Sequence, residues 1–269
     1  MKTIQQKYFQ ICNGLYKPMG FIRIGRTYLR LLNDVIQCFT FERISFGRSC
    51  RVWYGVVPLS MGIDSHIPEG GYLLHDLTPE FYWENDLHNE SSVDAVLDCI
   101  IPLISEEIIS LFDEADCCKT ALPSLLQHDK RVFENMKQKY KQQRNSWEIE
   151  GMERATVTDT KYYMALKIGD IDYAIQHYEA KLRLRNKLIE REEANQMNDP
   201  DHDYSGRIDL YLKQRLQIEA VLSSLCQKDL SWVKMLVQQN EKKTKNHFIN
   251  NYPRCVKNAQ ERGDINWLW

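Results

Sequence analysis

Paired metal-binding cysteines and long apolar runs are both missing from this sequence. None of the eight cysteines forms a C-x-x-C pair, so the spacing of a zinc knuckle does not occur. The most apolar segment, Val93 to Phe112, contains Asp98, Pro102 and two glutamates, and charged side chains are costly in a bilayer. We therefore expect neither a zinc site nor a membrane-spanning helix.

A secretory signal is missing as well, because the chain opens with an amphipathic pattern instead of an uninterrupted apolar stretch. Four cysteines lie within apolar patterns, where a reduced thiol packs as a small hydrophobic group: Cys12, Cys38, Cys50 and Cys99. Reduced thiols are typical of the cytoplasm. The sequence therefore predicts a cytoplasmic protein.

Signatures of catalysis are missing too. The sequence has no H-E-x-x-H, no Gly-rich phosphate loop and no G-x-S-x-G turn. The run from Asn198 to Asp203 resembles a calcium loop, but Tyr204 and Leu210 stand where such a loop needs glycine and glutamate. An acid-capped helix start is expected there instead. We expect no metal and no cofactor, and we favour a non-catalytic protein over an enzyme.

Basic and acidic residues are segregated along the chain. Residues 1–60 contain nine lysines and arginines and two acids, whereas residues 61–120 contain one lysine and fourteen acids. The corresponding net charges are +7 and −13, although the whole chain has a net charge of only −2. Two blocks of opposite charge therefore adjoin each other in the sequence.

Short runs of aromatic and β-branched residues follow an N-terminal helix that is expected over Ile4 to Leu15. These runs predict four strands, over residues 21–24, 27–32, 35–41 and 51–57. Gly25-Arg26 and Asn33-Asp34 separate the first three strands at hairpin spacing. Because antiparallel strands can be joined by such short turns, an antiparallel meander is favoured.

Beyond the strands the pattern changes. Residues 58–90 lack periodicity and are expected to be mostly loop, and a helix kinked at Pro102 is predicted from Ser92 to Phe112, covering the sheet. Later helices are predicted over residues 170–188, 208–225 and 232–248.

The fold class is therefore α+β, with an N-terminal antiparallel sheet packed by helices and then an all-helical region. A chain of 269 residues is long enough for two modest cores. Because strand patterns stop after Cys117, we predict an α+β domain over residues 1–118 and a helical domain over residues 119–269.

The segment from Tyr16 to Tyr28, YKPMGFIRIGRTY, and the strand from Val35 to Phe39 resemble the bacterial domain-of-unknown-function family numbered 4304. That family opens with a helix, a Pro-x-Gly-Phe turn and strands with a Gly-Arg-Thr-aromatic step. The resemblance covers about residues 5–120 and implies the N-terminal fold, but no established activity. Residues 50–55, CRVWYG, stand where the family's aromatic strand is expected, which leaves the pairing register open there.

A second resemblance, to tetratricopeptide helical hairpins, is carried by residues 165–178, ALKIGDIDYAIQHY. Gly169 suits the tight turn because glycine tolerates a left-handed backbone, and Asp170 is expected to cap the next helix. Related steps recur at Asp229 and Asp264, 59 and then 35 positions further along the chain. The second spacing is close to the period of such repeats, about 34 residues, and the first is not, with residues 197–206 as a candidate insertion. The resemblance implies stacked hairpins that bind a peptide or protein; an irregular helical bundle stays open as the alternative.

Arginines and aromatic residues cluster on the predicted sheet and form a candidate binding surface: Arg23, Arg26, Arg30, Arg51 and Trp53. Such a mix suits nucleic acid or an acidic protein. Three explanations stay open at this point. The basic sheet pairs with the chain's own acidic residues 61–120, or it binds an external acidic protein, or it binds nucleic acid.

The favoured function is a bacterial, non-catalytic protein-binding module, either an adaptor or an immunity-like protein, with another protein as its partner and no membrane. The alternatives are nucleic-acid binding through the basic sheet and a hydrolytic enzyme that uses residues 66–90. Side chains suited to general acid-base catalysis lie in that segment: His66, His75, Asp76, Glu80, Glu84, Asp86 and His88.

Overall fold

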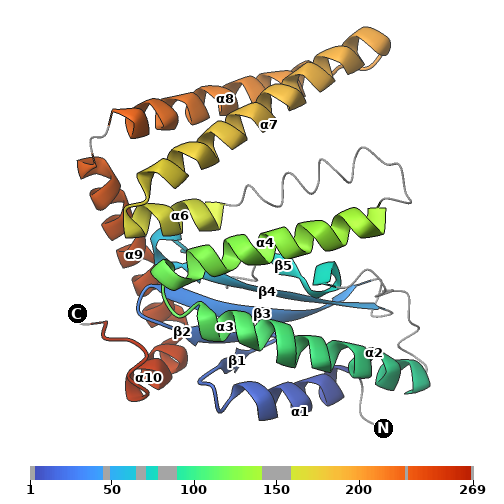
Figure 1. The fold of residues 1–269 in the computed structure, drawn as a ribbon, viewed down its shortest axis with the longest axis vertical. Coiled ribbons are helices and arrows are strands. Elements are labelled where there is room, and N and C mark those ends of the chain that lie inside the picture. Colours follow the sequence, from blue (N-terminus) through green and yellow to red (C-terminus); the bar gives the residue numbers. More distant parts are fainter. Residues whose placement is uncertain are drawn as a thin grey trace.

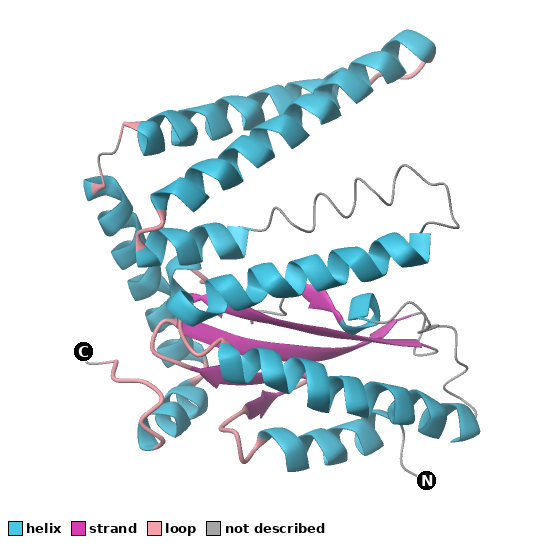
Figure 2. Ribbon diagram, viewed as in Figure 1, coloured by secondary structure: helices cyan, strands magenta, loops and turns pink. Residues whose placement is uncertain are grey.

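The computed structural model describes residues 4–44, 49–64, 71–77, 90–140, 159–227 and 230–267 (Figure 1). In these residues a five-stranded antiparallel sheet near the N-terminus is followed by a helical region, which confirms the predicted α+β class. Figure 2 shows the strands as a single layer with helices packed around it.

The strands pair with one another in the order of the chain, which confirms the predicted meander. They are β1 (Ile22–Ile24), β2 (Thr27–Leu31), β3 (Val35–Ile44), β4 (Ser49–Pro58) and β5 (Tyr72–Leu73). The last of these lies within residues 58–90, which were expected to be mostly loop. A strand of two residues is too short to leave an alternating pattern in a sequence.

One face of the sheet packs against α1 (Ile4–Tyr16), α2 (Glu90–Leu103), α3 (Ile109–Glu114) and α4 (Cys118–Tyr140) (Figure 1). Because strand side chains alternate between faces, the aromatic residues at every second position meet on this side. The rings of Tyr28 and Phe39 are stacked with centroids 4.7 Å apart, and the ring of Tyr16 lies 4.0 Å from that of Phe39. This aromatic layer joins α1 to the middle of the sheet.

The predicted apolar face of the helix beyond residue 90 is confirmed at the six positions whose side chains are buried: Leu97, Ile100, Ile104, Ile108, Leu111 and Phe112. The irregularity expected at Pro102 takes the form of a π-helical turn, η4 (Ile104–Ile108), which follows it directly.

The expectation that four cysteines lie in the core is wrong for Cys99. This thiol is exposed, because it lies beside the exposed Asp98 on the outer side of α2. Cys12 and Cys38 are buried as expected, and the side chain of Cys50 lies outside the described residues.

The second face of the sheet is partly covered by the C-terminal helices α9 (Ser231–Asn251) and α10 (Pro253–Glu261). Buried residues of both helices pack against strand residues there, including Phe248, Cys255, Val256, Leu29, Leu31 and Ile36. The fully buried Thr244 of α9 donates to the Leu59 carbonyl at 2.9 Å and accepts from the Ile63 amide at 2.8 Å. These bonds attach α9 to the turn that follows β4.

The larger buried cluster extends from Tyr8 to Val237. Side chains from both sides of residue 118 therefore share one core, and the C-terminal helices complete the covering of the sheet. The predicted division into domains over residues 1–118 and 119–269 stays a prediction.

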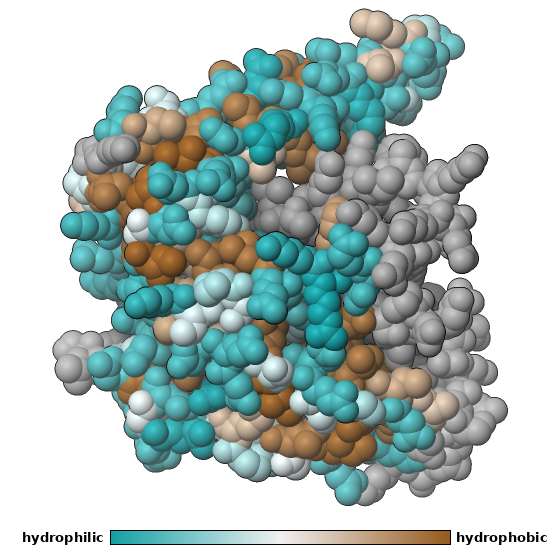
Figure 3. Space-filling model, in the orientation of Figure 1, coloured by the Kyte–Doolittle hydropathy of each residue, from teal (hydrophilic) through white to brown (hydrophobic). Residues whose placement is uncertain are grey.

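A long helical hairpin, made by α7 (Ile171–Asn198) and α8 (Ser205–Cys226), extends away from the sheet (Figure 1). The helix α6 (Asp159–Ile168) precedes it. Figure 3 shows hydrophobic residues gathered where the base of the hairpin meets α6 and α9. Among the described residues, the base of the hairpin is the part that packs against the larger core.

The turn between α6 and α7 has the predicted form. Gly169 has a φ of +81°, and the Asp170 carboxylate accepts from the Tyr173 amide at 3.0 Å. Gly263 also has a positive φ, but no described helix begins at Asp264, and Asp229 lies outside the described residues. The repeated hairpin array stays a prediction.

Candidate functional site

A groove runs beside β1, the strand at one edge of the described sheet. Its walls are the end of α1, the strand itself and the junction of α9 with α10, and its volume is about 850 Å³. That volume lies within the range of about 300–1,000 Å³ typical of ligand sites. The groove brings together residues that are more than 200 positions apart in the sequence.

Three basic side chains line this groove and carry its charge: Lys17, Arg23 and Arg254. All three are exposed, and no aspartate or glutamate lies among the lining residues of the described chain. The Arg23 guanidinium lies over the Phe9 ring, 4.4 Å from its centroid, which holds the side chain at the wall. The groove is therefore a cationic site without an internal counter-charge, and we call it the cationic groove.

Apolar and amide side chains make up the rest of the cationic groove. Phe21, Ile22, Ile24 and Tyr252 contribute apolar surface, and three asparagines contribute amides: Asn13, Asn251 and Asn258. The Tyr28 hydroxyl donates to Asn13 Oδ1 at 2.9 Å, and burial raises the pKa of this hydroxyl well above its ordinary value. It therefore stays a donor at neutral pH and fixes the Asn13 amide.

The five residues predicted to form one basic surface are separated in the structure. Arg23 lies in the cationic groove, and Arg26 is exposed in the turn after β1. Arg30 instead forms an ion pair with Asp264 beyond α10, at 3.6 Å. Of these residues, only Arg23 lines the cationic groove.

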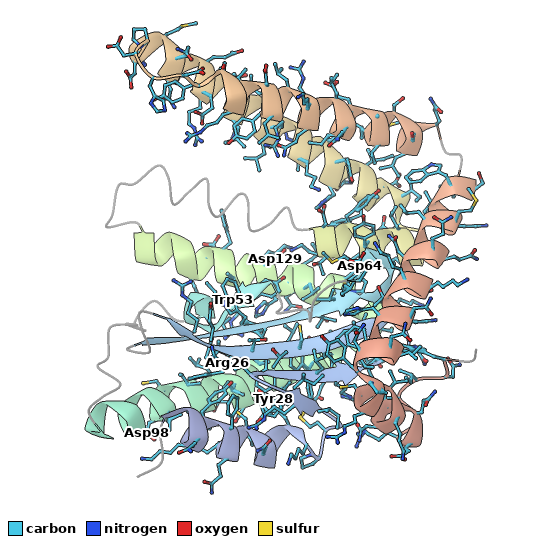
Figure 4. All side chains as sticks on the ribbon, turned by 180° about the vertical axis from the view of Figure 1, so that it is seen from behind. Arg26, Tyr28, Trp53, Asp64, Asp98 and Asp129 are labelled. Carbon is cyan, nitrogen blue, oxygen red and sulfur yellow. The ribbon has the colours of Figure 1, made fainter. Side chains whose placement is uncertain are left out.

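Arg51 and Trp53 share a sheet face, as their spacing predicts, but they lie on β4, away from the cationic groove. Arg51 lies opposite Glu42, and Trp53 Nε1 donates to Glu42 Oε2 at 2.9 Å. Figure 4 shows Trp53 and Arg26 at the part of the sheet that α9 and α10 do not reach. Arg51 and Trp53 therefore have the Glu42 carboxylate beside them.

In the part of the chain that the structure describes, no ion pair joins the basic strands to the acidic residues 61–120, although the pKa of Asp116 is lowered by its hydrogen bond from Thr120 and also by the charge of Arg30. Acidic residues of that block contact later cations instead: Glu107 pairs with Arg131, and Asp64 pairs with Lys243 at 2.6 Å. The groove cations Lys17 and Arg254 have no ion pair with any described residue. Within these ranges, the groove charge remains available to a ligand.

A polar network that sequence reasoning missed joins the sheet to α4 and α6. The Tyr54 hydroxyl lies 2.7 Å from His128 Nε2, Lys161 Nζ lies 2.6 Å from Asp129 Oδ2, and Tyr72 donates to Asp129 Oδ1 at 2.6 Å. Burial lowers the pKa of His128 to about 4, so this ring is neutral at pH 7. These residues are scattered through the sequence and match no motif. Because they bind one another, the network fixes the two helices against the sheet.

A second cleft, of about 670 Å³, lies between α6, α7 and α8. Its charged groups are already partnered: Lys181 pairs with Asp159, and Arg185 lies 4.9 Å from the centroid of the Tyr211 ring. His177 and then Lys181 lower the pKa of Asp159 to about 2. The cleft therefore offers less uncompensated charge than the cationic groove.

The remaining predicted candidates give no site. His75 and Asp76 lie in the short helix η3 (Leu74–Leu77), but their side chains are not described, and the other candidates of residues 66–90 lie outside the described residues: His66, Glu80, Glu84, Asp86 and His88. Asp203 accepts from the Ser205 amide at 2.9 Å, one residue before the N-cap of α8, which is Tyr204 and makes no capping bond with its own side chain. Within the described ranges, no three His, Cys, Asp or Glu side chains converge in a way that could hold a metal ion.

Comparison with known proteins gives no match: no family model, no curated protein and no solved structure matches this chain. The two family resemblances therefore stay predictions. Among the described helices, none combines the length and the apolarity that crossing a bilayer requires.

Proposed function

We propose that this chain is a bacterial, cytoplasmic, non-catalytic protein-binding module, and that its cationic groove binds an acidic segment of a partner protein. The observation that carries the proposal is the charge of the groove. Lys17, Arg23 and Arg254 line it, and no carboxylate of the described chain lies among the lining residues. Complementary charge gives an interface its specificity and speeds its association.

A protein partner fits the lining better than nucleic acid does. Apolar side chains from β1 and Tyr252 share the groove with the cations, and amides of three asparagines lie beside them. Interfaces with proteins combine an apolar centre with a polar rim, whereas nucleic-acid affinity comes chiefly from phosphate contacts. The bacterial source, the two family resemblances and the adaptor or immunity-like role belong to the same proposal.

The test is direct binding of a fluorescent peptide of alternating glutamate and valine, measured by anisotropy. Arg254→Glu should weaken binding about tenfold, because it replaces an attraction by a repulsion worth roughly 1.4 kcal/mol in all. An acid is favourable in the first turn of α10, so this variant should fold. Lys213→Glu on the exposed side of α8 makes the same charge change far from the groove and should leave affinity unchanged.

Two results would contradict the proposal. Equal affinity of the Arg254→Glu and Lys213→Glu variants for the peptide would show that the groove does not bind it. Tighter binding of a single-stranded oligonucleotide than of the peptide, with a steep dependence on salt, would favour the nucleic-acid alternative instead.

A further inference from the structure

We propose that the partner segment binds as an added strand along the free edge of β1, with acidic residues at alternate positions. This inference rests on the proposed function, because it specifies how the cationic groove would hold a protein segment. Extended peptides commonly bind exposed sheet edges in this way, with backbone hydrogen bonds for affinity and alternate side chains for specificity.

The backbone of β1 supplies the first argument. Its pairs with β2 are Ile22 with Leu29, Arg23 with Tyr28, and Ile24 with Thr27. A two-residue turn closes this hairpin, so Ile24 and Thr27 exchange hydrogen bonds, and antiparallel pairs alternate between bonded and non-bonded. The Arg23 amide and carbonyl therefore point away from β2.

Those two groups face the cationic groove and not another strand. The sheet order places β1 at an edge of the described sheet, and no backbone hydrogen bond of Arg23 outside the sheet occurs in the described residues. The neighbouring Phe21 amide already donates to the Tyr16 carbonyl at 3.2 Å. Arg23 is thus the position at which an incoming strand would exchange a pair of backbone hydrogen bonds.

The walls of the groove supply the second argument, because they differ in chemistry. Arg23 points to the face of the sheet that carries α1, and Lys17 lies at the end of that helix. Ile22 and Ile24 point to the opposite face, where they pack with the cluster around α9 and α10. The wall with Arg23 and Lys17 is therefore cationic, and the wall beside Ile22 and Ile24 is apolar along the strand, although Arg254 and two asparagines of α9 and α10 also line it.

An added strand places alternate side chains on opposite faces, and residues paired across strands share a face. The residue opposite Arg23 would therefore point to the cationic wall, and its two neighbours would point to the apolar wall. The partner that fits is an extended segment in which acidic and apolar residues alternate. The short length of β1 and the walls beside it limit uncontrolled pairing with other strands.

The experiment uses the full chain and two backbone-methylated forms of the glutamate–valine peptide. In the first form the amide nitrogens of the glutamates are methylated, and in the second form those of the valines are methylated. In the antiparallel added strand proposed here, residues opposite Arg23 direct their amides toward β1, so methylating the glutamates should weaken binding at least about tenfold. Methylating the valines should leave affinity within about twofold, because their amides point to solvent.

Each outcome bears on a separate part of the proposal. Equal affinity of the two methylated peptides, or a loss with the valine form only, would overturn the added strand. If that occurred while Arg254→Glu still weakened binding about tenfold relative to Lys213→Glu, the acidic-partner function would stand without the added strand. No binding of the unmodified peptide to the wild-type protein would overturn both.

Discussion

Replacing Thr244 by valine would test whether α9 is an integral part of the sheet core. The Thr244 side chain is fully buried, and its hydroxyl bonds both the Leu59 carbonyl and the Ile63 amide. Valine has nearly the same shape, so the substitution removes the hydroxyl and leaves no cavity of consequence. The Ile63 amide would then lose its partner, whereas the Leu59 carbonyl would keep the Gly62 amide at 3.2 Å.

An unsatisfied buried polar group costs about 1–3 kcal/mol, so Thr244→Val, which leaves one such group, should lower the free energy of unfolding by roughly 1–3 kcal/mol. The measurement is urea unfolding followed by circular dichroism. Thr244→Ser keeps the hydroxyl and loses one methyl group, so it should cost only about 1 kcal/mol. Equal stability of the Val variant and the wild type would refute the inference that these two hydrogen bonds hold α9 on the sheet.

Three further perturbations concern the described core. Burial lowers the pKa of His128 to about 4, so below pH 6.5 the unfolded chain binds a proton that the folded protein excludes, and this group should lower stability by about 3 kcal/mol down to pH 4. In urea titrations His128→Gln should remove this share of the dependence and leave the share of His177, whose pKa burial also lowers. Gly20→Ala should destabilise by more than 1 kcal/mol, since φ is +96° and the added Cβ would lie 2.4 Å from Arg262 Nε, whereas the control Gly14→Ala in α1 meets no atom within 4 Å and should stabilise slightly in thermal unfolding. Lys161→Met leaves the Asp129 carboxylate without its buried ammonium partner, so it should lower the free energy of unfolding in urea by about 3–5 kcal/mol. A loss below about 1 kcal/mol would contradict the importance of that ion pair.

The sheet could be predicted from the sequence because its signals are local. Aromatic and β-branched residues alternate along each strand, and Gly25-Arg26 and Asn33-Asp34 mark the turns between strands. The start of α7 was predicted for the same reason, since Gly169 and Asp170 are neighbours whose turn and capping roles need no distant partner.

Packing between distant segments could not be predicted in this way. Nothing in the local pattern of α9 shows that Thr244 binds the turn after β4, and nothing near Arg30 shows that Asp264 is its partner. The cationic groove needs both Arg23 and Arg254, which only the folded chain brings together. The separation of charge along the sequence did indicate a basic region, but it did not show which arginines have carboxylate partners.

The most direct test of the account is to locate the bound glutamate–valine peptide on the isotope-labelled protein by NMR. The account predicts that the largest shifts of backbone amide signals fall in residues that line the cationic groove, namely 21–24, 251, 252, 254 and 258. Shifts confined to the cleft around Tyr211 on α8, with none along β1, would contradict the claim that the groove is the binding site.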